Sequence, residues 1–254
     1  MDNEDGAAPE IPHSVIVIQN PTNEGFARAC NQGIAASDGE LVVLINPDSL
    51  VDHDFFASLE DFFEGNPKAG IAGPRIVDAS GTLQLSARRE VSFVSGLLGR
   101  TSFLTRLFPS SAAVKNLFPA AGSHDEPAEV DWISGACMAV RREALETAGA
   151  LDERFFMYFE DADLCRRARG SGWPVYYVPQ VEVLHLTGAS SRSKATAIWR
   201  LHKSAFLYHR KHGRHGPLGL YSGLVLLGLC ARAVVKSVIV VSHQVSAISK
   251  KQFG

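Results

Sequence analysis

Three carboxylates lie within four positions of one another, directly after an aromatic run. The segment Phe155–Phe159 (FFMYF) is followed by Glu160, Asp161 and Asp163. A carboxylate beside an apolar wall is partly desolvated, which raises its pKa and suits it to act as a general base. The same residues also lie where the first turn of a helix is expected, and negative charge there is favourable without any catalytic role. Both interpretations stay open on these residues alone.

A fourth carboxylate, Asp48, lies in the turn Asn46–Ser49. The preceding segment Leu41–Ile45 is continuously apolar, as a strand covered on both faces should be. Ligands of open α/β sheets bind beyond the carboxyl ends of strands, where a carboxylate can hold Mg²⁺ or Mn²⁺ together with substrate phosphates. The alternative is turn chemistry, in which Asp48 bonds its own backbone.

His185 is a further candidate metal ligand. It ends the apolar segment Val181–Leu184 and precedes a loop that contains Gly188. Neutral imidazole is a common metal ligand. A single histidine can equally be a hydrogen-bonded structural residue, and the sequence does not decide between the two.

These side chains need a scaffold, and the apolar pattern predicts an α/β fold. A strand at Ser14–Gln19, a helix at Glu24–Ala36 and a strand at Leu41–Ile45 would make one βαβ unit with parallel strands. A helix at Asp52–Glu64 and a strand at Gly70–Val77 are expected next. The side chains that this second helix would bury are Phe55, Phe56, Leu59, Phe62 and Phe63.

The second half continues the pattern after a less regular stretch at about 92–127. The further elements are expected at Asp131–Val140 (strand), Arg142–Ala148 (helix), Glu160–Arg169 (helix), Val175–Val178 (strand) and Val181–Leu184 (strand). The whole is predicted to be a mostly parallel sheet flanked by helices.

Composition excludes a disordered chain and shows a strong charge asymmetry. Of the 254 residues, 46% are hydrophobic and 20% are charged, which allows a substantial core. Residues 1–182 carry 14 Lys and Arg against 27 Asp and Glu, a net charge of −13, and residues 183–254 carry 11 Lys and Arg with no acidic residue. This basic tail predicts contact with an anionic surface. Four cysteines without a CxxC pair indicate reduced thiols and no zinc site.

The tail is expected to be helical from Thr196 and to form a unit of its own, 196–254, beside a domain at 1–195. Residues 217–231 are uncharged, and Arg232 and Lys236 then interrupt the apolar run. A spanning helix needs about 20 mostly apolar residues, and a central arginine is costly in a bilayer. The pattern favours an interfacial or re-entrant amphipathic helix over a true span or a soluble packing helix. Nucleic-acid binding is not expected, because the basic residues accompany no recognised nucleic-acid module.

Taken together, five segments resemble the family 2 glycosyltransferases, which have a GT-A fold, and above all their rhamnosyltransferase-like bacterial branch. The segments are Asn23–Ile34 (NEGFARACNQGI), Leu41–Ser49 (LVVLINPDS), Trp132–Leu145 (WISGACMAVRREAL), Leu151–Trp173 (LDERFFMYFEDADLCRRARGSGW) and Tyr177–His185 (YVPQVEVLH). The resemblance covers Val15–Ser191. The long aromatic and acidic motif, in this order after Asn-Pro-Asp, is its most specific part.

The resemblance implies a role for each candidate residue. A divalent cation, Mg²⁺ or Mn²⁺, would bridge the diphosphate of a nucleotide-sugar to Asp48, with His185 as a further ligand, and would act as a Lewis acid. Asp161 would deprotonate the acceptor hydroxyl, with Glu160 as its neighbour or substitute, and the sugar would be transferred with inversion. The residues implied to contact donor or acceptor are Asn23, Gly25, Asn31, Asn46, Trp132, Gly135 and Asp163.

The resemblance and the tail together imply a peripheral enzyme at the cytoplasmic face of the bacterial cell membrane. It would transfer a sugar, with rhamnose from a dTDP donor as the favoured choice, to a lipid-linked or other saccharide acceptor in cell-surface polysaccharide synthesis. The family pattern normally begins with a strand, a helix and a second strand, and before Val15 this chain shows only a remnant near Asp2. The alternative hypothesis is therefore a truncated, non-catalytic homologue that acts as a membrane-bound partner or scaffold.

Overall fold

The computed structural model describes residues 15–84, 86–88, 126–186, 194–213 and 220–252. Its main sheet has the strand order β1-β8-β3-β9-β2, with β4 beside β3 and β6 beside β9. These strands are β1 (Leu41–Ile45), β2 (Ser49–Val51), β3 (Ile71–Val77), β4 (Leu83–Gln84), β6 (Ala128–Val130), β8 (Cys137–Arg141) and β9 (Val175–His185). A small second sheet pairs β5 (Ala87–Arg88) with β7 (Trp132–Ile133).

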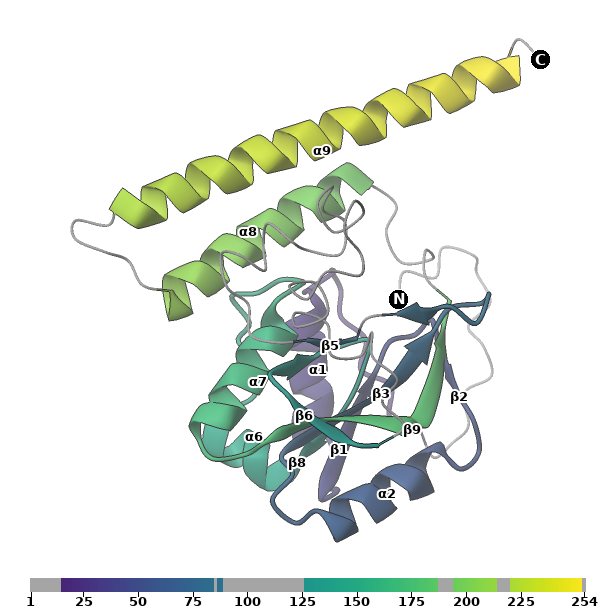
Figure 1. Cartoon of the computed structure of the whole chain (residues 1–254), viewed down its shortest axis with the longest axis vertical. Coiled ribbons are helices and arrows are strands. Elements are labelled where there is room, and N and C mark those ends of the chain that lie inside the picture. Colours follow the sequence, from purple (N-terminus) through teal and green to yellow (C-terminus); the bar gives the residue numbers. More distant parts are fainter. Residues whose placement is uncertain (1–14, 85, 89–125, 187–193, 214–219, 253–254) are drawn as a thin grey trace.

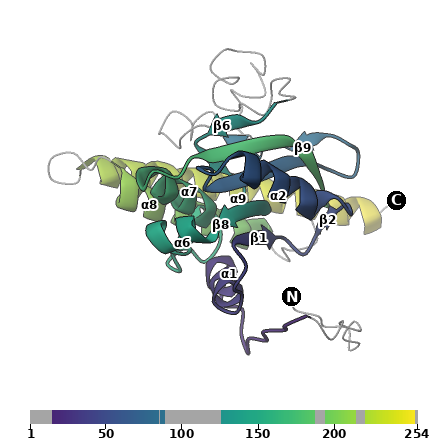
Figure 2. The same cartoon turned by 90° about the horizontal axis from the view of Figure 1, so that it is seen from below.

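Helices cover both faces of the main sheet (Figures 1 and 2). One face carries α1 (Phe26–Ala35), α6 (Arg142–Ala148) and α7 (Glu160–Gly170), and the other carries α2 (Phe55–Gly65). Two further helices, α8 (Lys194–His212) and α9 (Leu220–Gln252), lie beyond α7. In Figure 1, α9 runs along the side of α8 that is turned away from the sheet.

The main sheet is mixed, so the expected mostly parallel arrangement is wrong for the described strands. Among these, the parallel pairing is that of β3 with β9. The central strand β8 runs antiparallel to both of its neighbours, β1 and β3. Antiparallel strands also flank β9, which pairs with β2 and β6. Sequence periodicity predicts that a strand exists, but its direction depends on connections that periodicity does not describe.

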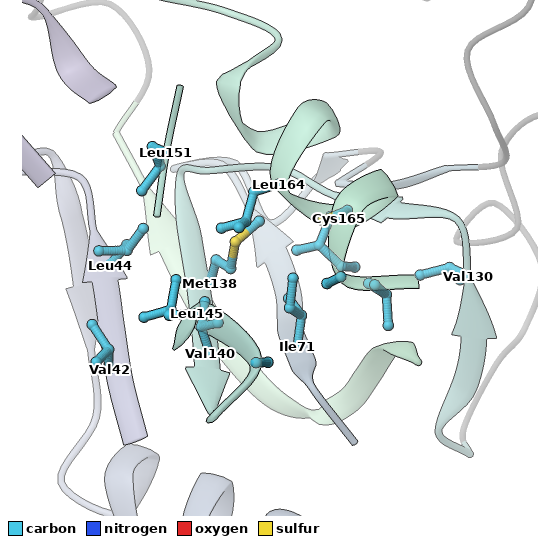
Figure 3. Close-up of a cluster of buried hydrophobic side chains, with 14 of the residues drawn as sticks. Val42, Leu44, Ile71, Val130, Met138, Val140, Leu145, Leu151, Leu164 and Cys165 are labelled. Atoms are coloured by element: carbon cyan, nitrogen blue, oxygen red, sulfur yellow. The ribbon is translucent and has the colours of Figure 1, made fainter. Parts of the chain in front are cut away.

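The continuous apolar character of β1 is explained by burial on both faces. Val42 and Leu44 point into a core shared with α6 and α7, where Leu145 and Leu164 are buried (Figure 3). The alternate residues of the strand pack against the core beneath α2. A strand covered on both faces needs apolar side chains at every position, and β1 has the bounds that the sequence predicts.

The expected buried strand at Ser14–Gln19 is wrong for Val15–Gln19, which have no regular secondary structure. Ile16 is 73% exposed and Val17 is 60% exposed. The chain is held next to α1 by reciprocal amide hydrogen bonds between Asn20 and Gln32, at 2.8 and 2.9 Å. In the described part of the sheet, β1 stands at one end of the strand order and pairs with β8. The expected βαβ unit with parallel strands is therefore not formed by these residues.

Most other expected elements are present with small differences. Phe56 is 51% exposed although its neighbours Phe55 and Leu59 are buried, because successive helical residues point about 100° apart. The two strands expected between Val175 and Leu184 form one strand, β9. The strand expected at Asp131–Val140 is two strands separated by a turn. Most of the stretch at 92–127 lies outside the described residues.

Candidate functional site

The carboxylate of Asp161, in the first turn of α7, is held by two backbone N–H groups. Gly135 donates to Oδ2 at 2.9 Å, and Ala162 donates to Oδ1 at 2.8 Å. Gly135 belongs to the turn between β7 and β8, and the carbonyl of the next residue, Ala136, accepts a hydrogen bond from the N–H of Asn46 at 2.9 Å. The turn therefore joins the predicted base to the carboxyl end of β1, where ligands of α/β sheets bind.

Glu160 and Asp161 are adjacent but electrostatically unequal. Glu160 is 5% exposed, and within the described residues its Oε2 has no hydrogen-bond partner. Burial first, and the negative charge of Asp161 second, raise the pKa of Glu160 to about 8. Burial also raises the pKa of Asp161, but the N–H groups of Gly135 and Ala162 and the charge of Arg88 oppose this rise. A neutral Glu160 is thus favoured at neutral pH, while the hydrogen-bond donors around Asp161 stabilise the ionised form of that carboxyl.

The raised pKa of Glu160 predicts that stability falls as the pH rises. An unfolded glutamate ionises at about pH 4.3, whereas Glu160 in the folded protein keeps its proton to a pKa of about 8. Between these values the folded state binds more protons, so the stabilising contribution is complete below the lower value and is lost as the pH rises through the upper one. We expect Glu160→Gln to remove this loss, which is on the order of a few kcal/mol by pH 9.

The measurement is the free energy of unfolding of both proteins from pH 5 to pH 9. Glu146→Gln is a matched control, because Glu146 is exposed on α6 and should keep the slope of the parent protein. Parallel curves for the parent protein and Glu160→Gln would contradict the raised pKa.

The turn before α7 has two consecutive residues in the left-handed region. Tyr158 has φ 72° and Phe159 has φ 70°, a conformation that costs on the order of 1–2 kcal/mol for each non-glycine residue. Contacts from α8 hold the turn: the hydroxyl of Ser204 donates to the carbonyl of Met157 at 2.7 Å, and the rings of Phe159 and Tyr208 lie 5.5 Å apart. The strained turn sets the direction in which α7 begins, and so the direction of its first carboxylates.

Gly25 supports the same turn from α1. Its φ is 87°, and a Cβ added there would overlap the carbonyl oxygen of Phe156. That carbonyl accepts a hydrogen bond from the N–H of Phe26 at 2.8 Å, while the side chain of Asn23 accepts one from the N–H of Gly25 at 3.0 Å. The predicted site residues Asn23 and Gly25 therefore shape the aromatic turn in this structure.

Asp163 has a structural role in this structure, and its expected contact with donor or acceptor stays a prediction. Its side chain is fully buried. Its carboxylate pairs with Arg167 at 2.8 Å, Lys211 at 2.7 Å and His212 at 2.6 Å. Burial alone would raise the pKa of Asp163, but hydrogen bonds from Lys211, His212 and Arg167 outweigh burial and hold this pKa below its usual range. The third carboxylate of the helix therefore anchors α8 to α7.

Asp48 and His185, the two predicted metal ligands, lie together. The Nε2 atom of His185 is 3.1 Å from Oδ1 of Asp48, and its Nδ1 atom is 3.1 Å from Oε1 of Gln84. The pairing of β2 with β9 causes this proximity, because it places Ser49 opposite His185. Both side chains keep a small exposed area, 11% for Asp48 and 13% for His185.

This pair fits a divalent cation that also binds substrate phosphates. The described residues contain no group of three or more His, Cys, Asp or Glu side chains that could hold a metal ion. Mg²⁺ is usually held by one or two carboxylates plus phosphates and water, so a two-residue site is compatible with it. Asp48 and His185 would supply one oxygen and one nitrogen.

Three further predicted residues have clear positions. Asn31 clamps the backbone of Leu151, donating to its carbonyl at 2.9 Å and accepting from its N–H at 3.0 Å. Trp132 is half-buried, and the guanidinium of Arg88 lies 4.8 Å from the centre of its ring. Gly135 leaves room beside the carboxylate, since an added Cβ would lie 3.4 Å from Cβ of Asp161. Gly135 thus borders the predicted base, Trp132 lies beside Arg88, and Asn31 has a structural contact.

Two residues near the site, Arg88 and Gln84, are not indicated by the sequence. Arg88 contributes positive charge to Asp161, and Gln84 contacts His185, which is 101 positions away. Both lie in two-residue strands, and such short segments have no periodicity to detect.

Comparison with known proteins gives matches over most of the chain. The family described as "Glycosyltransferase like family 2" matches residues 5–203. N-acetylglucosaminyl-diphospho-decaprenol L-rhamnosyltransferase of Mycobacterium tuberculosis (strain ATCC 25618 / H37Rv) is 34% identical over 211 residues, covering 77% of this chain and 66% of the relative. Rhamnosyltransferase WbbL of Escherichia coli (strain K12) is 25% identical over 173 residues, covering 68% of this chain and 62% of the relative. The chain thus spans just under two thirds of the length of these curated relatives.

One solved structure, GalNAc-T7 with UDP, GalNAc and Mn²⁺, aligns with a TM-score of 0.48 and 16% sequence identity, covering 76% of this chain and 36% of that chain.

Proposed function

Because the chain belongs to glycosyltransferase family 2, we propose that it transfers a sugar from a nucleotide-sugar to a lipid-linked saccharide in cell-surface polysaccharide synthesis. The names of two relatives favour rhamnose as the sugar, and a dTDP-linked donor is the first to test. We further propose a GT-A fold for the domain at 1–195, with 196–254 as a membrane-associating tail.

The observation that carries this proposal is the carboxylate of Asp161 beside the carboxyl end of β1. Both oxygens of Asp161 accept one backbone hydrogen bond each, from Gly135 and from Ala162. A carboxylate oxygen has two lone pairs, so each still has one to accept a proton. The two N–H groups also fix the orientation of the carboxylate, which suits a base that must face one hydroxyl.

In the proposed reaction the proton of the acceptor hydroxyl moves to Asp161. The acceptor oxygen forms a bond to the anomeric carbon as the bond from that carbon to the diphosphate oxygen breaks, and its electron pair leaves with the nucleoside diphosphate. One displacement on the face opposite the leaving group inverts the anomeric carbon. Glu160, kept neutral, adds no second negative charge near the diphosphate.

Asp48 and His185 are the proposed ligands of Mg²⁺ or Mn²⁺. When bound, the cation supplies Lewis-acid stabilisation of the negative charge on the leaving diphosphate. Gln84 contacts Nδ1 of His185 and so orients the ring with Nε2 facing Oδ1 of Asp48. Asn46, at the end of β1, and Trp132, beside Arg88, are proposed to line the donor and acceptor site.

The tail is proposed to keep the enzyme at the cytoplasmic face of the membrane. One helix in the described part of the chain, over Ser222–Val240, is long and apolar enough to cross a membrane by length and composition. All charged side chains after Glu182 are basic, which favours an anionic leaflet. A lipid-linked acceptor would be available at that surface.

A donor screen tests the proposal. We expect product from dTDP-rhamnose and N-acetylglucosaminyl-diphospho-polyprenol in the presence of Mn²⁺ or Mg²⁺, and loss of product with a chelator. NMR of the product should show an anomeric configuration opposite to that of the donor. UDP- and GDP-sugars are the comparison donors. If no donor is turned over on any acceptor, the non-catalytic membrane-bound homologue replaces the enzyme as the better hypothesis.

A further inference from the structure

One long face of α9 is apolar and uncovered. The exposed residues are Leu224 (68%), Leu227 (68%), Val234 (50%), Val235 (57%) and Val238 (62%). Their spacing of three, seven, one and three positions places them on one side of a helix that turns once every 3.6 residues. We call these five residues the outer face of α9. A contiguous exposed apolar patch marks an interaction surface.

The opposite face of α9 packs on α8. Ala233 is fully buried, Val225 is 9% exposed, and the hydroxyl of Ser222 lies 3.2 Å from Nε2 of His209 on α8. By the same helical spacing, Arg232 and Lys236 lie on this side. Burial first, and then the positive charges of Arg232 and Lys236, lower the pKa of His202 on α8. Arg232 and Lys236 therefore lie toward α8 and away from the outer face.

The helix α8, in turn, is fixed to the domain. Lys211 and His212 at its end pair with the buried Asp163 of α7, and Arg200 lies 4.3 Å from the centre of the Phe156 ring. In Figure 1, α8 lies between α9 and α7. If α9 left α8 to cross a bilayer, it would take Arg232 and Lys236 into the hydrocarbon, at about 2.5–3.5 kcal/mol each.

We propose that α9 lies in the plane of the membrane, with its outer face inserted among the lipids and its inner face still packed on α8. This inference rests on the membrane association in the proposed function and specifies its geometry. An anionic bilayer is the occupant that the charges favour, because α8 and α9 contain no acidic residue. A second copy seated on the outer face would instead bring two basic tails together.

The in-plane arrangement also places the active site relative to the membrane. Packed helices have axes about 8–10 Å apart, so the aromatic turn contacted by α8 lies about one helix layer from α9. The hydroxyl of Ser204 and the ring of Tyr208 contact this turn directly. The base at the start of α7 directly follows this turn and is thereby also held about one helix layer from α9.

The first experiment measures binding of the full chain to vesicles of phosphatidylglycerol and phosphatidylcholine. The test variant is Leu227→Gln/Val234→Gln/Val238→Gln, and the matched control is Ile16→Gln/Phe56→Gln, which changes exposed apolar residues elsewhere. We expect the test variant to partition at least about 100-fold more weakly and the control to bind like the parent protein. Unchanged binding of the test variant would overturn the inference. Circular dichroism verifies that α9 remains helical.

The second experiment measures depth along α9. Single cysteines at 224, 227, 234 and 238, in a background without Cys30 and Cys230, are labelled with an environment-sensitive fluorophore and quenched by lipids that carry the quencher at known depths. An in-plane helix gives one shallow depth for all four positions. A spanning helix gives depths for 224 and 238 that differ by roughly 20 Å, which would overturn the inference.

Two controls separate the remaining outcomes. Sedimentation of the lipid-free protein shows whether the outer face joins two copies, and a dimer that the test variant dissociates would overturn the lipid assignment. The vesicle measurements need neither donor nor acceptor. If they succeed while the donor screen fails, the in-plane helix stands and the proposed transfer activity does not.

Discussion

Asp161→Asn is expected to lower kcat by about 10²–10⁴-fold, the usual contribution of a positioned general base, with little change in affinity for the donor. The amide cannot accept the proton of the acceptor hydroxyl. It also accepts from only one of the two N–H groups that Asp161 binds, at Gly135 and Ala162, so a stability loss of about 1–3 kcal/mol is expected as well. Steady-state kinetics, donor titration and thermal unfolding separate these effects.

The pH dependence gives a second test of the same assignment. Burial raises the pKa of Asp161, so transfer should decline with falling pH earlier than an exposed aspartate would allow. In Asp161→Asn the transfer rate should be low, and the rate that remains should no longer decline with falling pH in this way. Asp54→Asn is the matched control, because Asp54 is exposed before α2 and should change neither. Turnover of Asp161→Asn at the rate of the parent protein would disprove the assignment.

Asp48→Ala is expected to weaken metal-dependent donor binding by more than about 10-fold, since even residues that only orient a metal ligand contribute 10–100-fold to affinity. The carboxylate is the charged member of the pair with His185, 3.1 Å away. Its removal leaves one nitrogen and no negative charge for Mg²⁺ or Mn²⁺, which prefer oxygen ligands. The measurement is calorimetric titration of dTDP-rhamnose with and without Mn²⁺.

Asp48→Asn and Asp52→Ala complete this experiment. The asparagine retains an oxygen that can accept from His185 but lacks the charge. The donor affinity of Asp48→Asn should therefore lie between those of the parent protein and Asp48→Ala. Asp52 is exposed four positions further along, and its replacement should leave binding unchanged. Equal binding of donor by Asp48→Ala and the parent protein, with the same Mn²⁺ dependence, would remove Asp48 from the metal site.

The local sequence was sufficient to predict the bounds of elements whose residues all have the same kind of surroundings. The apolar run Leu41–Ile45 and the short helix Arg142–Ala148 have the bounds that the sequence predicts. It was insufficient where an element depends on a neighbour. Val15–Gln19 has the composition of a buried strand, yet in this structure its exposed residues pair with no strand among those described.

The three carboxylates of α7 also show what the local sequence predicts and what depends on neighbouring elements. Glu160, Asp161 and Asp163 are nearly equivalent in the sequence, but their surroundings make them different. The Oε2 atom of Glu160 is buried without a partner within the described residues, and Asp161 is held by Gly135. Asp163 is buried against Arg167, Lys211 and the imidazole of His212. Except for Arg167, which lies on α7 itself, these partners come from other elements, up to 49 positions away for His212. A pattern within one helix therefore cannot assign their charges.

The sequence by itself determined the candidate groups, the family resemblance and the separation of an acidic body from a basic tail. Only the tertiary structure decided that Asp48 meets His185 across 137 positions, that Asp163 anchors α8, and that Arg232 and Lys236 lie toward α8. The physical reason is that residue type and periodicity are local properties of the chain. Hydrogen bonds, burial and charge pairing depend on which distant segments the fold brings within a few ångströms.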